Sequence, residues 1–191
     1  MTAAVVFDLD GVLLDSDVLG SLAELDPARV AGYRIREAAP RDEPLLEAML
    51  ELAMGWRERG APPPVASELT DLYVAGFGRP GDGGAVAEEV KGGRVGAAWF
   101  RIFDPNRPGY GFVAADVPEL SLAVVPEHRR RGLGRDLVEH ALRQAKEAGH
   151  REVSLSVEPD NPALRLYERL GFERVGKSGG SWTLIRRSAP L

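Results

Sequence analysis

The chain has 191 residues, 44% of them hydrophobic, which suits one domain with its own core, or one domain and a short appendage. Its formal net charge of −5 at pH 7 argues against a surface that binds nucleic acid through the phosphates. The absence of cysteine excludes disulfides, cysteine–zinc sites and a cysteine nucleophile.

The first 31 residues carry a motif unlike the rest of the chain. The segment Val5 to Ser16 joins an apolar run to Asp8-x-Asp10-Gly, which resembles the first motif of the haloacid dehalogenase superfamily of phosphatases. That resemblance implies Asp8 as nucleophile and Asp10 as acid, with Mg²⁺ holding the phosphate. Residues 20–32 leave no room for the remaining machinery of that family. We therefore expect residues 1–31 to be a catalytically inactive appendage, packed as an extra strand or paired with a second protomer in a homodimer.

Residues 32–191 are expected to form a single domain in which strands and helices are interspersed. Two glycines between apolar runs indicate a hairpin, and apolar residues spaced three or four apart indicate helices. The elements predicted in the first half are a strand, two helices and two hairpin strands: Tyr33 to Ala38, Pro44 to Trp56, Ser67 to Phe77, Ala85 to Lys91 and Arg94 to Phe103.

The second half alternates strands with helices. The predicted elements are a strand, a long helix, a strand, a shorter helix and two strands: Leu120 to Val125, Gly134 to about Ala148, Val153 to Val157, a helix opened by Asn161 and Pro162, Phe172 to Val175 and Ser181 to Ile185. This order predicts an α/β fold with a central mixed sheet and helices on both faces. The sequence has no apolar run of about 18 residues and no signal-peptide pattern, so we expect a cytoplasmic protein without a membrane span.

The segment Leu122 to Arg135 places two glycines, Gly132 and Gly134, between a predicted strand and a predicted helix. The first N–H groups of a helix lack intrahelical partners and form an anion site, which glycine leaves accessible. Four arginines add positive charge there: Arg129, Arg130, Arg131 and Arg135. The sequence thus indicates a pyrophosphate site, with a tight turn and solvated arginines as the alternative. No Gly-Lys-Ser/Thr is present, and Leu137 stands where a dinucleotide fingerprint needs its third glycine.

Two blocks of the sequence resemble the GNAT superfamily of N-acetyltransferases. The first is Arg129-x-x-Gly132-x-Gly134 after Val124-Val125-Pro126, and the second is Asn161 followed by Leu166 to Phe172, LYERLGF. One helix and one strand separate the blocks. The resemblance implies a mostly antiparallel sheet of about six to seven strands and transfer of an acetyl group from acetyl-CoA to an amine.

The resemblance also implies which residues hold acetyl-CoA. In that superfamily the strand before the anion loop splays from its neighbour, and the pantetheine arm lies along the gap. By this comparison the pantetheine contacts come from Leu122, Ala123, Val124 and Asn161, and the pyrophosphate contacts come from Arg129, Arg130, Arg131, Gly132, Leu133, Gly134 and Arg135.

Two residues are candidates for proton transfer. In the family the helix that carries Tyr167 faces the sulfur, which implies that its phenol protonates the leaving thiolate; the alternative is a core aromatic. Glu119 opens the strand before the cofactor loop, where members of the family often place a carboxylate or an ordered water, and the resemblance implies it as the candidate general base. The alternatives are a solvent-facing strand-end glutamate at Glu119 and a base at Glu158 instead.

The acceptor is expected to be a small-molecule or protein amine, selected by the helices of Pro44 to Phe77 and the loop Asp104 to Asp116. Three scattered histidines, His128, His140 and His150, predict no metal site. Two further functions remain open: a non-catalytic acyl-CoA-binding module, and a phosphatase acting through Asp8.

Overall fold

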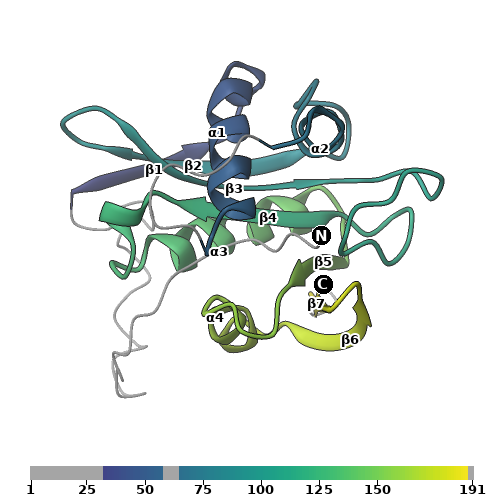
Figure 1. Ribbon diagram of the computed structural model, residues 1–191. Coiled ribbons are helices and arrows are strands. Elements are labelled where there is room, and N and C mark those ends of the chain that lie inside the picture. The colour runs from purple at the N-terminus through teal and green to yellow at the C-terminus, as the bar shows by residue number, and fades with distance from the viewer. Residues whose placement is uncertain (1–31, 58–64, 189–191) are drawn as a thin grey trace.

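Seven strands form one sheet in the order β1-β2-β3-β4-β5-β7-β6 (Figure 1). The computed structural model describes residues 32–57 and 65–188. All neighbours in the sheet are antiparallel except the parallel pair β4–β5. The strands are β1 Tyr33–Glu37, β2 Gly83–Glu89, β3 Arg94–Arg101, β4 Glu119–Val124, β5 Glu152–Val157, β6 Glu173–Ser178 and β7 Ser181–Arg187.

Helices cover both faces of the sheet, as expected from the sequence. The helices are α1 Glu43–Met54, α2 Ser67–Tyr73, α3 Leu133–Glu147 and α4 Leu164–Arg169. In Figure 1, α1 and α2 lie on one side of strands β1–β4, and α3 lies on the other. On the β5–β7–β6 side, Arg186 of β7 donates a hydrogen bond to the carbonyl of Leu170 at the end of α4. The predicted fold class, a mixed and mostly antiparallel sheet between helices, is confirmed.

Three predicted boundaries differ from the structure for local reasons. The helix α2 ends at Tyr73 instead of Phe77, because the N–H groups of Val74 and Ala75 both bond the Thr70 carbonyl and Gly76 follows with a left-handed φ of 65°. The helix α4 begins only at Leu164, because the N–H of Leu164 bonds the carbonyl of Asn161 and residues 161–164 form a turn first. The β2–β3 link contains residues 90–93, since a turn joins Glu89 to the first of its two glycines.

The sheet has two halves, β1–β4 and β5–β7–β6, which meet through little pairing. Between β4 and β5 the only registered pair is Glu119 with Ser154, at the beginning of β4. By contrast, β5 and β7 pair from Glu152 to Val157 along the whole of β5. Beyond Glu119 the outer edge of β4 therefore lies outside the ladder between the two halves.

The core lies between the sheet and the helices on each face. Its largest fully buried apolar side chains include Trp99, Phe100, Leu122, Leu137 and Leu155. The phosphatase-like motif of the first 31 residues lies outside the described part of the chain. Within the described part, no helix has both the length and the apolar character needed to cross a bilayer.

Candidate active site

The loop that the sequence marks as an anion site joins the end of β4 to α3. Gly132 precedes the helix with φ of +84°, a left-handed conformation that L side chains rarely adopt. No side chain in the described part of the chain caps α3, so the N–H groups of Leu133, Gly134 and Arg135 have no intrahelical acceptors. A Cβ at Gly132 would meet no atom within 4 Å. The positive end of the helix dipole is thus accessible to an anion.

The four arginines of this loop differ in what they contact. The half-buried Arg129 donates its Nε–H to the carbonyl of Val124 at 2.8 Å, which ties the loop to the end of β4. Arg131 bonds a tyrosine hydroxyl of β1 at 2.7 Å, and Arg135 pairs with a glutamate one turn further along α3. Arg130 is exposed and has a positive φ of 61°. The loop is therefore braced by side chains on both flanks, with positive charge around the helix start.

The three residues predicted to line the pantetheine lie at the end of β4. Backbone polar groups of a strand alternate between its two neighbours, and the N–H of Val125 bonds to β3. Leu122 and Val124 therefore direct their polar groups toward the β5 side, where no ladder continues. Ala123 pairs with Ala97 of β3, so its polar groups belong to that ladder and do not face the gap.

Asn161, in the connection from β5 to α4, holds a buried donor without an acceptor. Its side chain is 2% exposed, and its Oδ1 accepts the N–H of Ala163 at 2.9 Å. Its Nδ2 is buried and has no hydrogen-bond partner within residues 32–57 and 65–188. A buried amide donor left unpaired is costly, so a carbonyl acceptor supplied by a ligand fits this position. The amides of a pantetheine arm contain such carbonyls.

Tyr167, the candidate acid, is buried on the inner face of α4. Its side chain is 1% exposed, and its ring meets Phe172 edge to face at 5.6 Å between centroids. Burial raises the pKa of the phenol well above its ordinary value of 10.0. The side chain therefore stays protonated at neutral pH, a state that suits both a proton donor and a packed core residue.

Glu119, the candidate base, is 4% exposed at the beginning of β4. Its Oε1 accepts the phenol O–H of Tyr73 at 3.0 Å, and its buried Oε2 has no hydrogen-bond partner in the described residues. Burial raises the pKa of the carboxyl from 4.5 to about 7, while the nearby N–H of Gly111 and the Tyr73 phenol oppose this rise. A carboxyl with a pKa near 7 is suited to accept a proton at neutral pH.

Two residues of this network were not identified from the sequence. Tyr73 ends α2, and the backbone N–H of Tyr110, in the connection from β3 to β4, donates to its hydroxyl at 2.7 Å. Both positions lie in the segments expected to select the acceptor. The sequence carries no spacing that would join them, because the contact links α2, the connection and β4 across 46 residues.

The alternative base and the histidines are engaged elsewhere. Glu158 accepts the indole N–H of Trp56 at 3.1 Å and forms an ion pair with Arg57. His128 bonds the tyrosine hydroxyl of β1, and His150 contacts a phenylalanine ring of β3. In the described ranges, no three His, Cys, Asp or Glu residues come together as a metal site would require.

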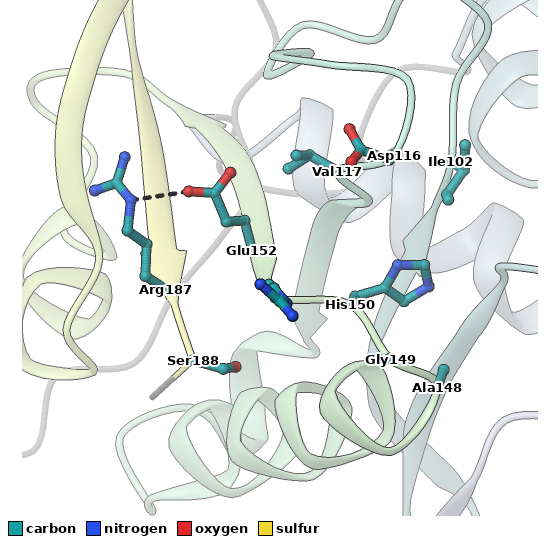
Figure 2. Close-up of a pocket in the computed structure, with 10 residues that line it drawn as sticks. Ile102, Asp116, Val117, Ala148, Gly149, His150, Glu152, Arg187 and Ser188 are labelled. Atoms are coloured by element: carbon teal, nitrogen blue, oxygen red, sulfur yellow. Dashed lines mark hydrogen bonds and ion pairs between the residues drawn. The ribbon is translucent and has the colours of Figure 1, made fainter. Parts of the chain in front are cut away.

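A surface cavity of about 590 Å³ lies near the end of α3 and the start of β5 (Figure 2). Its charged lining includes Asp116, Arg151 and the ion pair of Glu152 with Arg187 at 2.8 Å. Neither Glu119, Asn161 nor any residue of the anion loop lines it. This cavity is therefore separate from the candidate active site.

Comparisons with known proteins agree with the geometry of the anion loop and the sheet. The sequence profile described as "Acetyltransferase (GNAT) family" matches residues 46–172. A mycothiol acetyltransferase of Tsukamurella paurometabola is 35% identical over 160 residues, which cover 79% of this chain and 52% of that protein. The chain thus spans about half the length of this curated relative.

Solved structures share the fold. A GNAT superfamily phosphinothricin acetyltransferase from Sinorhizobium meliloti, in complex with AcCoA, is 22% identical with a TM-score of 0.62, covering 82% of this chain and 89% of that one. A ribosomal-protein-alanine N-acetyltransferase from Brucella melitensis is 25% identical with a TM-score of 0.59, covering 81% and 99%. Both likenesses extend over the sheet and its helices.

Proposed function

This chain belongs to the acetyltransferase (GNAT) family, and from that premise we propose that residues 32–191 transfer the acetyl group of acetyl-CoA to a primary amine. The observation that carries the proposal is the placement of three features around the β4–β5 junction. These are the uncapped start of α3, the unpaired Nδ2 of Asn161 and the buried carboxyl of Glu119.

On the cofactor side, the proposal assigns the pyrophosphate to the N–H groups of Leu133, Gly134 and Arg135 and to the nearby arginines. Backbone groups of Leu122 and Val124 on the β5 side, with the amide of Asn161, are assigned to the pantetheine. Acetyl-CoA supplies an acyl group activated as a thioester. Strand β4 would orient the thioester, because the pantetheine arm, which contains amides, would be held along the strand at several points.

On the acceptor side, Glu119 takes a proton from the amine, whose nitrogen then attacks the thioester carbonyl directly. The C–N bond forms, the C–S bond breaks, and Tyr167 is assigned to protonate the sulfur. The chain contains no cysteine, so no thioester with the enzyme can form on a thiol. The acceptor class, a small-molecule or a protein amine, belongs to the proposal as well.

The test is to incubate the purified full chain with acetyl-CoA and a panel of amines. The panel holds small primary amines and peptides with free α-amino or lysine amines. We expect thiol release that depends on the amine, with an acetylated product identified by mass spectrometry. Tight binding of acetyl-CoA with no amine-dependent thiol release would show a non-catalytic acyl-CoA-binding module instead.

A further inference from the structure

The phenol of Tyr73 lies between the candidate base and the connection that covers it. Its hydroxyl donates to Oε1 of Glu119 at 3.0 Å and accepts the backbone N–H of Tyr110 at 2.7 Å. Both distances lie within the range of ordinary hydrogen bonds. Because the side chain of Tyr73 is 4% exposed, water does not compete with either bond.

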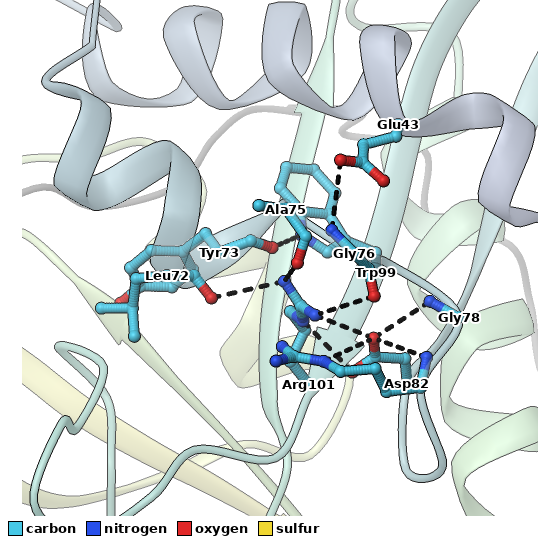
Figure 3. Close-up of polar contacts among 10 residues, drawn as sticks. Glu43, Leu72, Tyr73, Ala75, Gly76, Gly78, Asp82, Trp99 and Arg101 are labelled. Atoms are coloured by element: carbon cyan, nitrogen blue, oxygen red, sulfur yellow. Dashed lines mark hydrogen bonds and ion pairs between the residues drawn. The ribbon is translucent and has the colours of Figure 1, made fainter.

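The end of α2 that carries Tyr73 is fixed on β3. The Trp99 indole donates to the Tyr73 carbonyl at 3.0 Å, and the buried guanidinium of Arg101 donates to the Ala75 carbonyl at 3.1 Å (Figure 3). Arg101 is held in turn by Asp82 at 3.0 Å. The ring of Tyr73 meets that of Phe103 at 5.1 Å. The position of the hydroxyl is therefore set by contacts with β3 and with Phe103 just after it.

The two oxygens of Glu119 have different surroundings. Oε1 is held by Tyr73, whereas Oε2 is buried without a hydrogen-bond partner in the described part of the chain. Oε2 faces Gly109, where a Cβ would stand only 2.2 Å from it. Glycine at this position thus lets Oε2 lie against the backbone of the β3–β4 connection, where a side chain would clash with it.

We propose that Tyr73 is the positioning residue of the Glu119 base, which holds Oε1 so that Oε2 accepts the proton of the amine. The same hydroxyl ties the β3–β4 connection to the base through Tyr110. This inference rests on the proposed function, because it needs Glu119 to act as the base. Burial raises the pKa of Tyr73 well above 10.0, so the phenol keeps its proton and donates.

The direct test replaces Tyr73 by phenylalanine, which keeps the ring and removes the hydroxyl. The groups facing Glu119 are the phenol and the backbone of residues 109–111, and a lost donor favours the neutral carboxyl. We expect kcat to fall roughly tenfold and the acid limb of the pH profile to move up by roughly half to one unit. The Kd of acetyl-CoA should stay unchanged.

A matched control is Tyr110→Phe, which removes a hydroxyl from the same aromatic cluster but keeps the backbone N–H that bonds Tyr73. Its acid limb should match that of the wild type, because the N–H that bonds Tyr73 is unchanged. If Tyr73→Phe does not fold, 3-fluorotyrosine at position 73 provides the second variant. Its stronger donor should move the acid limb to lower pH.

A readout independent of turnover is an infrared titration of the Glu119 carboxyl band, identified by its loss in Glu119→Gln. An unchanged midpoint in Tyr73→Phe, or a change in KM alone, would reduce Tyr73 to a packing or substrate contact. Failure of the proposed function would give a result distinct from failure of the Tyr73 proposal. In that case Glu119→Gln keeps its full rate, or no amine is acetylated, while the infrared midpoint still reports whether Tyr73 holds the carboxyl.

Discussion

The two ends of β4 present two kinds of chemistry. At its carboxyl end, Gly132 leaves backbone N–H groups open, and the nearby arginines are braced on strands. At its amino end, Glu119 is buried and accepts a hydrogen bond from Tyr73. Backbone groups can bind a phosphate in any chain with this turn, whereas a carboxyl with a raised pKa depends on particular neighbours. Substitutions at the first end should therefore change binding, and those at the second end should change turnover.

The largest effect is expected from Glu119→Gln. The amide keeps the shape of the side chain but cannot accept the proton, so kcat should fall by roughly 10²- to 10⁴-fold. The Kd of acetyl-CoA, measured by calorimetry, should remain that of the wild type. A variant with normal kcat would remove Glu119 from the mechanism, and one with weakened cofactor binding would remove the distinction between the two ends.

The next largest effect is expected from Gly134→Glu at the other end. A carboxylate beside the first turn of α3 repels the pyrophosphate and fills its space, which should weaken binding of CoA by roughly 10²- to 10³-fold. The matched control is Glu139→Gln, one turn further along α3, which removes a partner of Arg135 and should change binding little. Retained tight binding in Gly134→Glu would contradict the loop assignment.

A moderate effect is expected from pH, which should change kcat/KM through the amino end of β4 but leave CoA binding at the carboxyl end unchanged. Burial raises the pKa of Glu119 to about 7, and the proposed base acts when ionised, so kcat/KM should fall roughly tenfold per unit as the pH drops below that value. Binding of CoA should lack this limb. The raised pKa also makes the wild type lose stability as pH rises from 4.5 to 7, by roughly 3 kcal/mol relative to Glu119→Gln. Urea unfolding at pH 5 and pH 8 measures that difference.

The smallest effect is expected from Tyr167→Phe. The ring and its contact with Phe172 remain, and the phenol hydroxyl is lost. We expect kcat to fall by roughly tenfold, because water can protonate the thiolate less efficiently. The rate of acetyl transfer from acetyl-CoA to an amine, measured under single-turnover conditions, tests this expectation. An unchanged rate would leave Tyr167 as a core aromatic.

The same contrast between the ends explains what could be predicted from the sequence. The sheet, its helices and the anion loop follow from local patterns, such as the alternation in β5 and the two glycines before α3. Glu119 could be named as a candidate from its place at the start of a strand. Its burial could not, because Tyr73 and Tyr110 reach it from distant segments. The late start of α4 was missed because residues 161–164 form a turn, closed by the Leu164 N–H and the Asn161 carbonyl, which the sequence pattern does not distinguish from a first helical turn.

Because only one residue pair is registered between β4 and β5, that junction is the weakest strand pairing of the sheet. Both adjoining ladders run along whole strands, so under partial unfolding the halves should part here first. A ligand that forms hydrogen bonds with both strands would stabilise the β4–β5 junction. Amide hydrogens of Leu122 and Val124 would then exchange with solvent far more slowly, and the enzyme would resist proteolysis only while its donor is bound.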